Sequence, residues 1–229
     1  MTNDLENRRP LKVRSASWAR AAAARLAHAN VSPDAISCAG VACAVLGGSL
    51  MMLAGGLGPA GRAVALILAV LCIQLRLVCN LLDGLVAVEH GKASPAGPIW
   101  NELPDRVADV LFLVGAGYFA RTAGLHGAEA LGWLAAVLAV VTAYVRELGR
   151  GLGQPADFRG PMAKPQRMAA LTVACLISVV ELLWRGNGQI MVAALAIIVV
   201  GTLITVVRRT RHLAIRLSDN IQSEDEDQH

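Results

Sequence analysis

The chain has 229 residues, of which 55% are hydrophobic, 17% are charged and 4% are aromatic, and its formal net charge is +4 at pH 7. A soluble domain carries about 25% charged residues, and a single buried core does not require such an excess of aliphatic side chains. The composition therefore excludes an ordinary soluble protein and predicts an all-α protein with several membrane-spanning helices. Nucleic-acid binding is disfavoured, because no aromatic or repeated pattern accompanies the basic residues.

Residues 1–30 predict a cytoplasmic arm that ends in an amphipathic helix lying along the membrane interface. The segment 15–29 is rich in alanine and places Trp18 beside two arginines, a combination that suits the headgroup region. Ser32 then has the character of a helix N-cap and Pro33 that of a first helical residue. No cleavable signal peptide is expected, because the first apolar run begins after residue 30.

Residues 31–208 predict one domain with six apolar stretches, each long enough to cross roughly 30 Å of hydrocarbon at about 1.5 Å per residue. They lie at 35–56, 62–82, 98–119, 127–147, 167–184 and 189–207. The second stretch carries Arg76, Asn80 and Asp83, which are unfavourable in lipid. Residues 209–229 are expected to form a cytoplasmic tail that is acidic and disordered at its end.

The distribution of lysine and arginine predicts that both termini are cytoplasmic, because positive residues are retained on that side of a membrane. With six spans, four segments face the same side and hold 16 of the 21 basic residues. These residues are Arg8, Arg9, Lys12, Arg14, Arg20, Arg25, Lys92, Arg146, Arg150, Arg159, Lys164, Arg167, Arg208, Arg209, Arg211 and Arg216. We therefore expect an integral protein of a bacterial inner membrane.

Four oxygen-bearing side chains occupy the facing ends of the second and third predicted spans. Asn80 and Asp83 are three residues apart, and Asn101 and Asp105 are four apart, so each pair shares one helix face. Two antiparallel helices would bring the pairs together at the membrane boundary, where oxygen ligands suit Mg²⁺ or Mn²⁺. The alternative is that these residues only cap helix ends.

The same residues resemble the signature of the CDP-alcohol phosphatidyltransferase family, D-x2-D-G-x2-A-R-x8-G-x3-D-x3-D. The spacing fits completely when Asn80 and Asp83 take the first two aspartate positions and Asn101 and Asp105 the last two. The small residues of the signature match Gly84, Ala87 and Gly97. An alternative alignment, which moves the final aspartates to Asp105 and Asp109, needs a four-residue insertion and loses the last glycine.

The resemblance implies transfer of a phosphatidyl group from a CDP-linked lipid such as CDP-diacylglycerol to an alcohol acceptor, with release of CMP, in phospholipid biosynthesis. It implies that Asp105 is the general base and that Asn80, Asp83, Asn101 and Asp105 are the metal-binding positions, with two divalent cations in the family. It also implies that Gly84, Ala87 and Gly97 form the nucleotide floor, and that the protein is a homodimer.

Basic residues further along the chain extend the resemblance. Arg146, Arg150, Lys164 and Arg167 look like the family's residues that bind the phosphate of a polyol-phosphate acceptor. Arginines and a lysine at a membrane edge form a reasonable anion pocket. Their alternative role is topological, since positive residues belong on this side in any case. Arg76, inside a span, is expected to pair with an intramembrane acid or to extend toward the interface.

This sequence departs from the signature at three positions: Asn80 and Asn101 replace aspartates, and Val88 replaces the arginine. Two fewer negative charges are then available to hold cations. A second hypothesis follows, in which the protein is a catalytically altered member that binds CDP-lipid or metal as a partner or regulator. A transporter is a weaker hypothesis, because the polar residues cluster on one face rather than reaching both.

Overall fold

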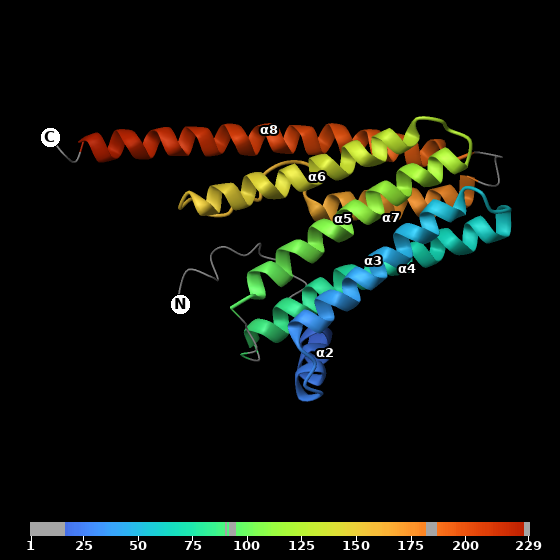
Figure 1. Ribbon diagram of the computed structural model, residues 1–229, viewed down its shortest axis with the longest axis horizontal. Helices are drawn as coiled ribbons and strands as arrows, with labels where there is room; N and C mark the ends of the chain where they lie inside the picture. Colours follow the sequence, from blue (N-terminus) through green and yellow to red (C-terminus); the bar gives the residue numbers. More distant parts are fainter. Residues whose placement is uncertain (1–16, 90, 92–94, 182–186, 227–229) are drawn as a thin grey trace.

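The structure is a computed structural model that describes residues 17–89, 91, 95–181 and 187–226, with side chains described as far as residue 219. The described residues form an all-helical bundle of seven helices (Figure 1). The helices are α2 (Ser17–His28), α3 (Pro33–Ala54), α4 (Pro59–Glu89), α5 (Gly97–Thr122), α6 (Ala128–Gly151), α7 (Lys164–Glu181) and α8 (Gln189–Glu226).

Helices α3 to α8 correspond one by one to the six apolar stretches, so the predicted all-α architecture is confirmed. Four of them, α3, α4, α6 and α8 as far as Asp219, are long and apolar enough to cross a membrane. Helix α5 falls outside this group because its first turns carry charged residues such as Glu102 and Asp105, and the 18-residue helix α7 begins with Lys164. The protein is therefore a membrane protein by its apolar helices, while the count of six spans stays a prediction.

The N-terminal segment forms helix α2, which packs against the end of α4. Ala19 and Ala23 are buried there, in one cluster with Leu82, Leu85 and Val86 of α4. The turn that follows is capped as the sequence predicts: the side chain of Ser32 accepts a hydrogen bond from the backbone of Ala35 at 3.2 Å. The location of α2 along the membrane interface stays a prediction.

Glycines allow α5 to pass close to its neighbours α3 and α6. A Cβ atom at Gly115 would lie 2.6 Å from the carbonyl oxygen of Gly48 on α3, closer than any real contact of that kind. A Cβ atom at Gly117 would lie 2.9 Å from the Cα atom of Gly132 on α6. Small residues of this kind permit the close backbone approach that drives helix association in membranes. From Ala108 to Ala120, α5 is therefore largely buried between its neighbours, whereas Leu103 nearer its start is 60% exposed.

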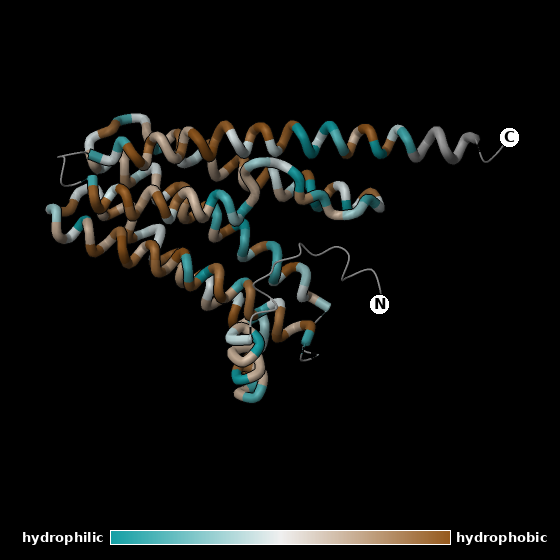
Figure 2. The backbone as a smooth tube through the Cα atoms, turned by 180° about the vertical axis from the view of Figure 1, so that it is seen from behind, coloured by the Kyte–Doolittle hydropathy of each residue, from teal (hydrophilic) through white to brown (hydrophobic). Residues whose placement is uncertain are grey.

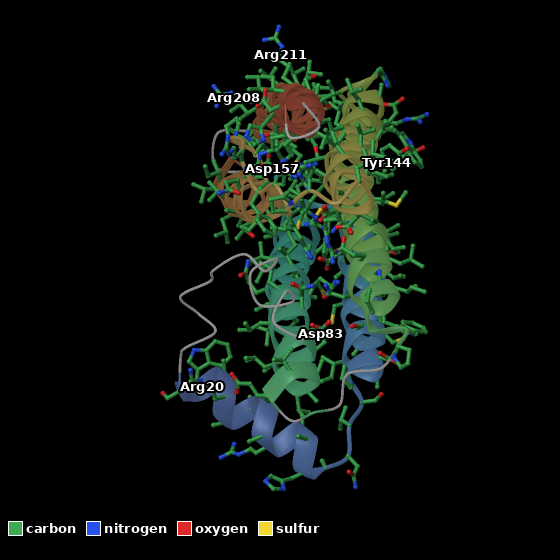
Figure 3. The ribbon with its side chains drawn as sticks, turned by 90° about the vertical axis from the view of Figure 1, so that its left-hand side faces the viewer. Arg20, Asp83, Tyr144, Asp157, Arg208 and Arg211 are labelled. Carbon is green, nitrogen blue, oxygen red and sulfur yellow. The ribbon has the colours of Figure 1, made fainter. Side chains whose placement is uncertain are left out.

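Apolar and polar segments are separated along the bundle (Figure 2). Hydrophilic positions gather where α5 begins, where α6 ends and along the distal part of α8. In Figure 3, Arg208 and Arg211 point outward from α8, whereas Asp83, which is 4% exposed, lies within the bundle. Helix α8 extends to Glu226, and residues 227–229 lie outside the described part; the disorder expected at the end of the tail stays a prediction.

Candidate active site

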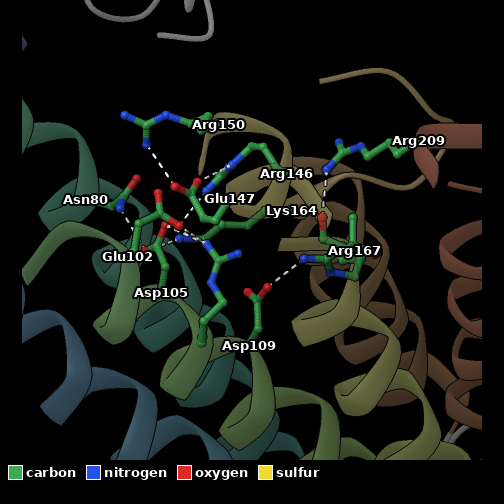
Figure 4. A network of polar contacts seen from close by, with 12 residues as sticks. Asn80, Glu102, Asp105, Asp109, Arg146, Glu147, Arg150, Lys164, Arg167 and Arg209 are labelled. Atoms are coloured by element: carbon green, nitrogen blue, oxygen red, sulfur yellow. Dashed lines mark hydrogen bonds and ion pairs between the residues drawn. The ribbon is translucent and has the colours of Figure 1, made fainter. Parts of the chain in front are cut away.

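The two halves of the predicted motif meet through a hydrogen bond between α4 and α5. The side-chain amide of Asn80 donates to Oδ1 of Asp105, with a distance of 2.8 Å between the two atoms (Figure 4). Asn80 lies in the last third of α4, and Asp105 lies two turns into α5. The polar ends of the two helices are therefore adjacent, as their spacing predicts.

Asp105 is surrounded by positive side chains. Nη2 of Arg76 donates to its Oδ1 at 2.5 Å, and Nζ of Lys164, on α7, pairs with the same oxygen. The other oxygen, Oδ2, lies 3.6 Å from Nη2 of Arg106. Arg76 is only 1% exposed, so its predicted pairing with an intramembrane acid is confirmed. A buried carboxylate needs such partners, because an unpaired charge in this environment is costly.

Asp83 has a different environment from Asp105. Its Oδ2 accepts a hydrogen bond from the hydroxyl of Ser37 on α3 at 2.6 Å. Its Oδ1 is buried and has no hydrogen-bond partner within the described part of the chain. Ser37 is not among the site residues predicted from the sequence, and its contact with Asp83 was missed. A serine one turn after the N-cap Ser32, on a helix that faces α4, was the available signal.

The remaining motif residues lie near the end of α4 and the start of α5. Asn101 is exposed, one turn before Asp105 on α5. A Cβ atom at Gly84 would meet nothing within 4 Å, so open space adjoins this glycine. Ala87 and Gly97 are partly exposed at the end of α4 and the start of α5. Gly84 therefore borders free space rather than a packed helix neighbour.

Arg146 and Arg150 form an ion-pair network beside the motif (Figure 4). The guanidinium of Arg146 pairs with Glu102 on α5 and also with Glu147, the latter at 2.9 Å. Arg150 pairs with the other oxygen of Glu147 at 2.9 Å. Arg146 also lies over the ring of Phe158, with 5.8 Å from its guanidinium carbon to the ring centroid. The network links α6 to the start of α5.

A second buried pair joins α5 to α7. Nη2 of Arg167 donates to Oδ2 of Asp109 at 2.6 Å, and Nη1 of Arg167 donates to the carbonyl of Met162 at 3.1 Å. The structure thus brings Lys164 and Arg167 of α7 against two successive turns of α5. These are the turns that carry Asp105 and Asp109.

Arg209 on α8 is a site-adjacent residue that sequence reasoning treated only as a topology signal. It is 4% exposed; its Nε donates to the carbonyl of Arg159 at 2.9 Å and its Nη1 to the carbonyl of Thr142 at 3.1 Å. The position of Arg209 in the helix could have indicated its burial, because it shares a face of α8 with Thr202 and Thr205, which are buried as well. A pocket beside it, between α6 and α8, is lined by Arg146, Arg209, His212 and Arg216 among others.

Asp83 offers an oxygen of the kind that holds a divalent cation. Magnesium is usually held by one or two carboxylates together with substrate phosphates. The unpartnered Oδ1 of Asp83 is a buried oxygen of that type. Within the described part of the chain, no group of three or more His, Cys, Asp or Glu side chains is arranged to hold a metal. The nearby carboxylate of Asp105 already has Arg76 and Lys164 as partners.

Comparison with known proteins gives one curated relative and a set of solved structures. No family model matches the chain. The archaetidylinositol phosphate synthase of Aeropyrum pernix is 29% identical over 156 residues, which cover 68% of this chain and 74% of that protein.

Two of the similar structures are crystal structures of the phosphatidylinositol phosphate synthase of Mycobacterium tuberculosis. The one in complex with manganese and citrate has a TM-score of 0.67 at 18% identity, covering 85% of this chain and 88% of that chain. The one with CDP-DAG bound has a TM-score of 0.68 at 19% identity, covering 86% and 94%. This likeness shows a shared fold. The relative, the shared fold and the complete spacing of the motif agree with the resemblance to the CDP-alcohol phosphatidyltransferase family.

Proposed function

We propose that this protein transfers a substituted phosphate group from a CDP-linked lipid to an alcohol acceptor and releases CMP. The observation that carries the proposal is the hydrogen bond between Asn80 and Asp105, which joins the two halves of the signature into one site. The curated relative is named as an archaetidylinositol phosphate synthase, and one similar structure has CDP-DAG bound. Both names describe chemistry of this class.

In this reaction the acceptor hydroxyl attacks the phosphorus that carries the lipid, and the bond from that phosphorus to the CMP oxygen breaks. Asp105 is assigned as the base that takes the hydroxyl proton, through Oδ2, because three donors already converge on its Oδ1. Gly84, Ala87 and Gly97 are assigned to the nucleotide, and the open space at Gly84 supports this role.

A divalent cation, Mg²⁺ or Mn²⁺, would neutralise the diphosphate and the departing CMP when bound. Asp83 is its principal ligand in this proposal, with Asn80, Asn101 and Asp105 as the other metal-binding positions. The similar structure that contains manganese supports the choice of metal.

The acceptor is proposed to be an alcohol or polyol phosphate, held by Arg146, Arg150, Lys164 and Arg167. The location of these four basic residues beside the motif, on α6 and α7, supports an anionic acceptor. The relative and the similar structures are named as synthases of inositol phosphate lipids, which also favours a phosphorylated polyol.

The proposed setting is a bacterial inner membrane, crossed six times, with the site and both termini on the cytoplasmic side. Burial of α5 from Ala108 to Ala120 between its neighbours and the crowding of basic residues on one face support this topology. We assign residues 31–208 to the six-span domain, residues 1–30 to the cytoplasmic arm and 209–229 to the cytoplasmic tail. The family resemblance leads us to propose a homodimer.

The test is CMP release by the purified protein. With Mg²⁺ or Mn²⁺, CDP-diacylglycerol and a panel of polyols and polyol phosphates, at least one acceptor should support CMP release. The Asp83→Asn and Asp105→Asn variants should each abolish it. If no acceptor supports release, the proposed reaction is wrong; if both variants stay active, the residue assignments are wrong.

A second candidate function is CDP-lipid or metal binding without turnover, in a partner or regulatory role. It is favoured by the ion pairs of Asp105 with Arg76 and Lys164, which oppose proton uptake by that carboxylate. Restoring aspartate at positions 80 and 101 distinguishes the two functions. Activity that appears only in the Asn80→Asp/Asn101→Asp variant would identify an altered, non-catalytic site.

A further inference from the structure

Arg76 carries a buried positive charge, and its side chain fills a space left by the packing of α3 against α4. Its side chain is 1% exposed, the buried residues of α4 that precede it are apolar, and it lies one turn before Asn80. Gly40 of α3 provides the space, because a Cβ atom there would lie 3.0 Å from both Cδ and Nη1 of Arg76. Burial of a charge is costly unless the charge is paired, and a buried arginine in a membrane protein suggests a functional role.

The partner of Arg76 is the carboxylate that a metal site at this position would need. Oδ1 of Asp105 receives Arg76 at 2.5 Å and Asn80 at 2.8 Å, and Lys164 pairs with it too. A cation that used this oxygen would have to displace those donors. It would also approach the guanidinium of Arg76 and be repelled by it.

The balance of charge around the motif leads to the same result. Asp83 and Asp105 supply two negative charges, Asn80 and Asn101 supply none, and Arg76 removes one of the two. Lys164 pairs with Asp105 as well, so Asp83 is the motif carboxylate that remains to compensate a cation. A second cation would have to lie beside Asp105, against the guanidinium of Arg76, and would be repelled by it whether positions 80 and 101 hold asparagine or aspartate. Among the four motif positions in the described part of the chain, Oδ1 of Asp83, a residue that is 4% exposed, is the buried carboxylate oxygen without a hydrogen-bond partner, and it marks where one cation fits. Oδ1 of Asp109 also lacks a partner there, but the charge of Asp109 is already paired with Arg167.

We propose that Arg76 supplies, as part of the chain, the positive charge that a second divalent cation would otherwise bring, so that the site holds one divalent cation, on the side of Asp83. The guanidinium neutralises Asp105 permanently, and its Nε, which lacks a hydrogen-bond partner in the described part of the chain, remains a donor. The choice of a divalent cation as the ligand rests on the proposed function, whereas the number of ions does not.

The test counts Mn²⁺ bound per chain in the full-length protein, purified in detergent, from the room-temperature EPR signal of unbound Mn²⁺. The wild-type protein should bind one ion, and Asp83→Asn should bind none. Asn80→Asp/Asn101→Asp, which keeps Arg76, should still bind one. Arg76→Gln/Asn80→Asp/Asn101→Asp should bind two.

Arg62→Gln is the matched control, because Arg62 is an arginine of the same helix at its other end, and its count should remain one. Two ions or none in the wild-type protein would overturn the proposal, as would two ions in Asn80→Asp/Asn101→Asp, one ion in Asp83→Asn, or a single ion in the triple variant. If the triple variant does not fold, the first three counts still decide the matter. A protein that binds one Mn²⁺ but releases no CMP would refute the transferase reaction and leave this inference standing.

Discussion

The carboxylate of Asp109 and the guanidinium of Arg167 form an ion pair at 2.6 Å that is sealed from solvent, with side-chain exposures of 1% and 2%. The pair connects α5, which carries the second half of the motif, to α7. Removing one partner of a buried pair leaves a desolvated charge without compensation, whereas removing both avoids that cost.

Arg167→Met alone should therefore destabilise the protein by about 3–5 kcal/mol, and Asp109→Leu/Arg167→Met should be less destabilised than that single variant. The measurement is the free energy of unfolding in mixed detergent micelles as SDS is added. Equal losses in the single and double variants would show that the pair does not act as a unit. Arg121→Met, which removes an exposed ion pair with Glu129, is the control and should cost at most about 1 kcal/mol.

The close passage of α5 across α3 should depend on Gly115. Gly115→Ala places a Cβ atom 2.6 Å from the backbone oxygen of Gly48, which cannot move as a side chain does. We expect a loss of about 1–3 kcal/mol in the same unfolding assay, because overpacking forces backbone shifts. Gly151→Ala is the control: nothing lies within 4 Å of its Cβ position, so stability should be unchanged or slightly higher. Equal stability of the two variants would contradict the packing described.

A larger side chain at Gly84 should weaken donor binding and leave folding unaffected. Gly84→Leu projects into open space, so its thermal stability should match that of the wild-type protein. If the nucleotide lies there, the KM for CDP-diacylglycerol should rise by about tenfold or more, equivalent to roughly 1.4 kcal/mol of lost binding. Gly58→Leu, in the turn at the other end of α4 and also in open space, should leave KM unchanged. An unchanged KM in Gly84→Leu would remove this residue from the nucleotide floor.

Removal of divalent cations should stop CMP release. EDTA in excess should lower the rate to less than about a hundredth, because the diphosphate then loses its charge compensation. Addition of Mn²⁺ or Mg²⁺ beyond the chelator should restore the rate. Release that persists in EDTA would mean that Arg76, Lys164 and their neighbours suffice as the cations of the site.

The proposed topology places the turn after α3 and the loop after α6 on opposite sides of the membrane. In a variant with its five cysteines changed to alanine, Gly58→Cys should react with an impermeant maleimide on intact cells. Leu152→Cys, which is 50% exposed after the end of α6, should react only after the membrane is permeabilised. The reverse pattern would invert the topology, and labelling of both positions in intact cells would contradict the span count between them.

The sequence alone determined the helical elements and the pairing of the motif. Apolar runs long enough to cross a bilayer leave the backbone no alternative to a helix, and the spacings 80–83 and 101–105 put each polar pair on one face. The cap at Ser32 followed from an equally local rule, and pairing with an acid was one of the two roles expected of Arg76.

Only the tertiary structure decided how the charges of the site are distributed. Periodicity places Arg76, Lys164, Arg167 and Arg209 near one membrane edge, but it does not show which acid each one meets. That depends on how closely the helices pass, which glycines such as Gly40 and Gly115 set through space left empty. The resemblance to a metal-binding signature predicts where the site lies, and the contact of Arg76 with Asp105 is the observation from which we propose one divalent cation there.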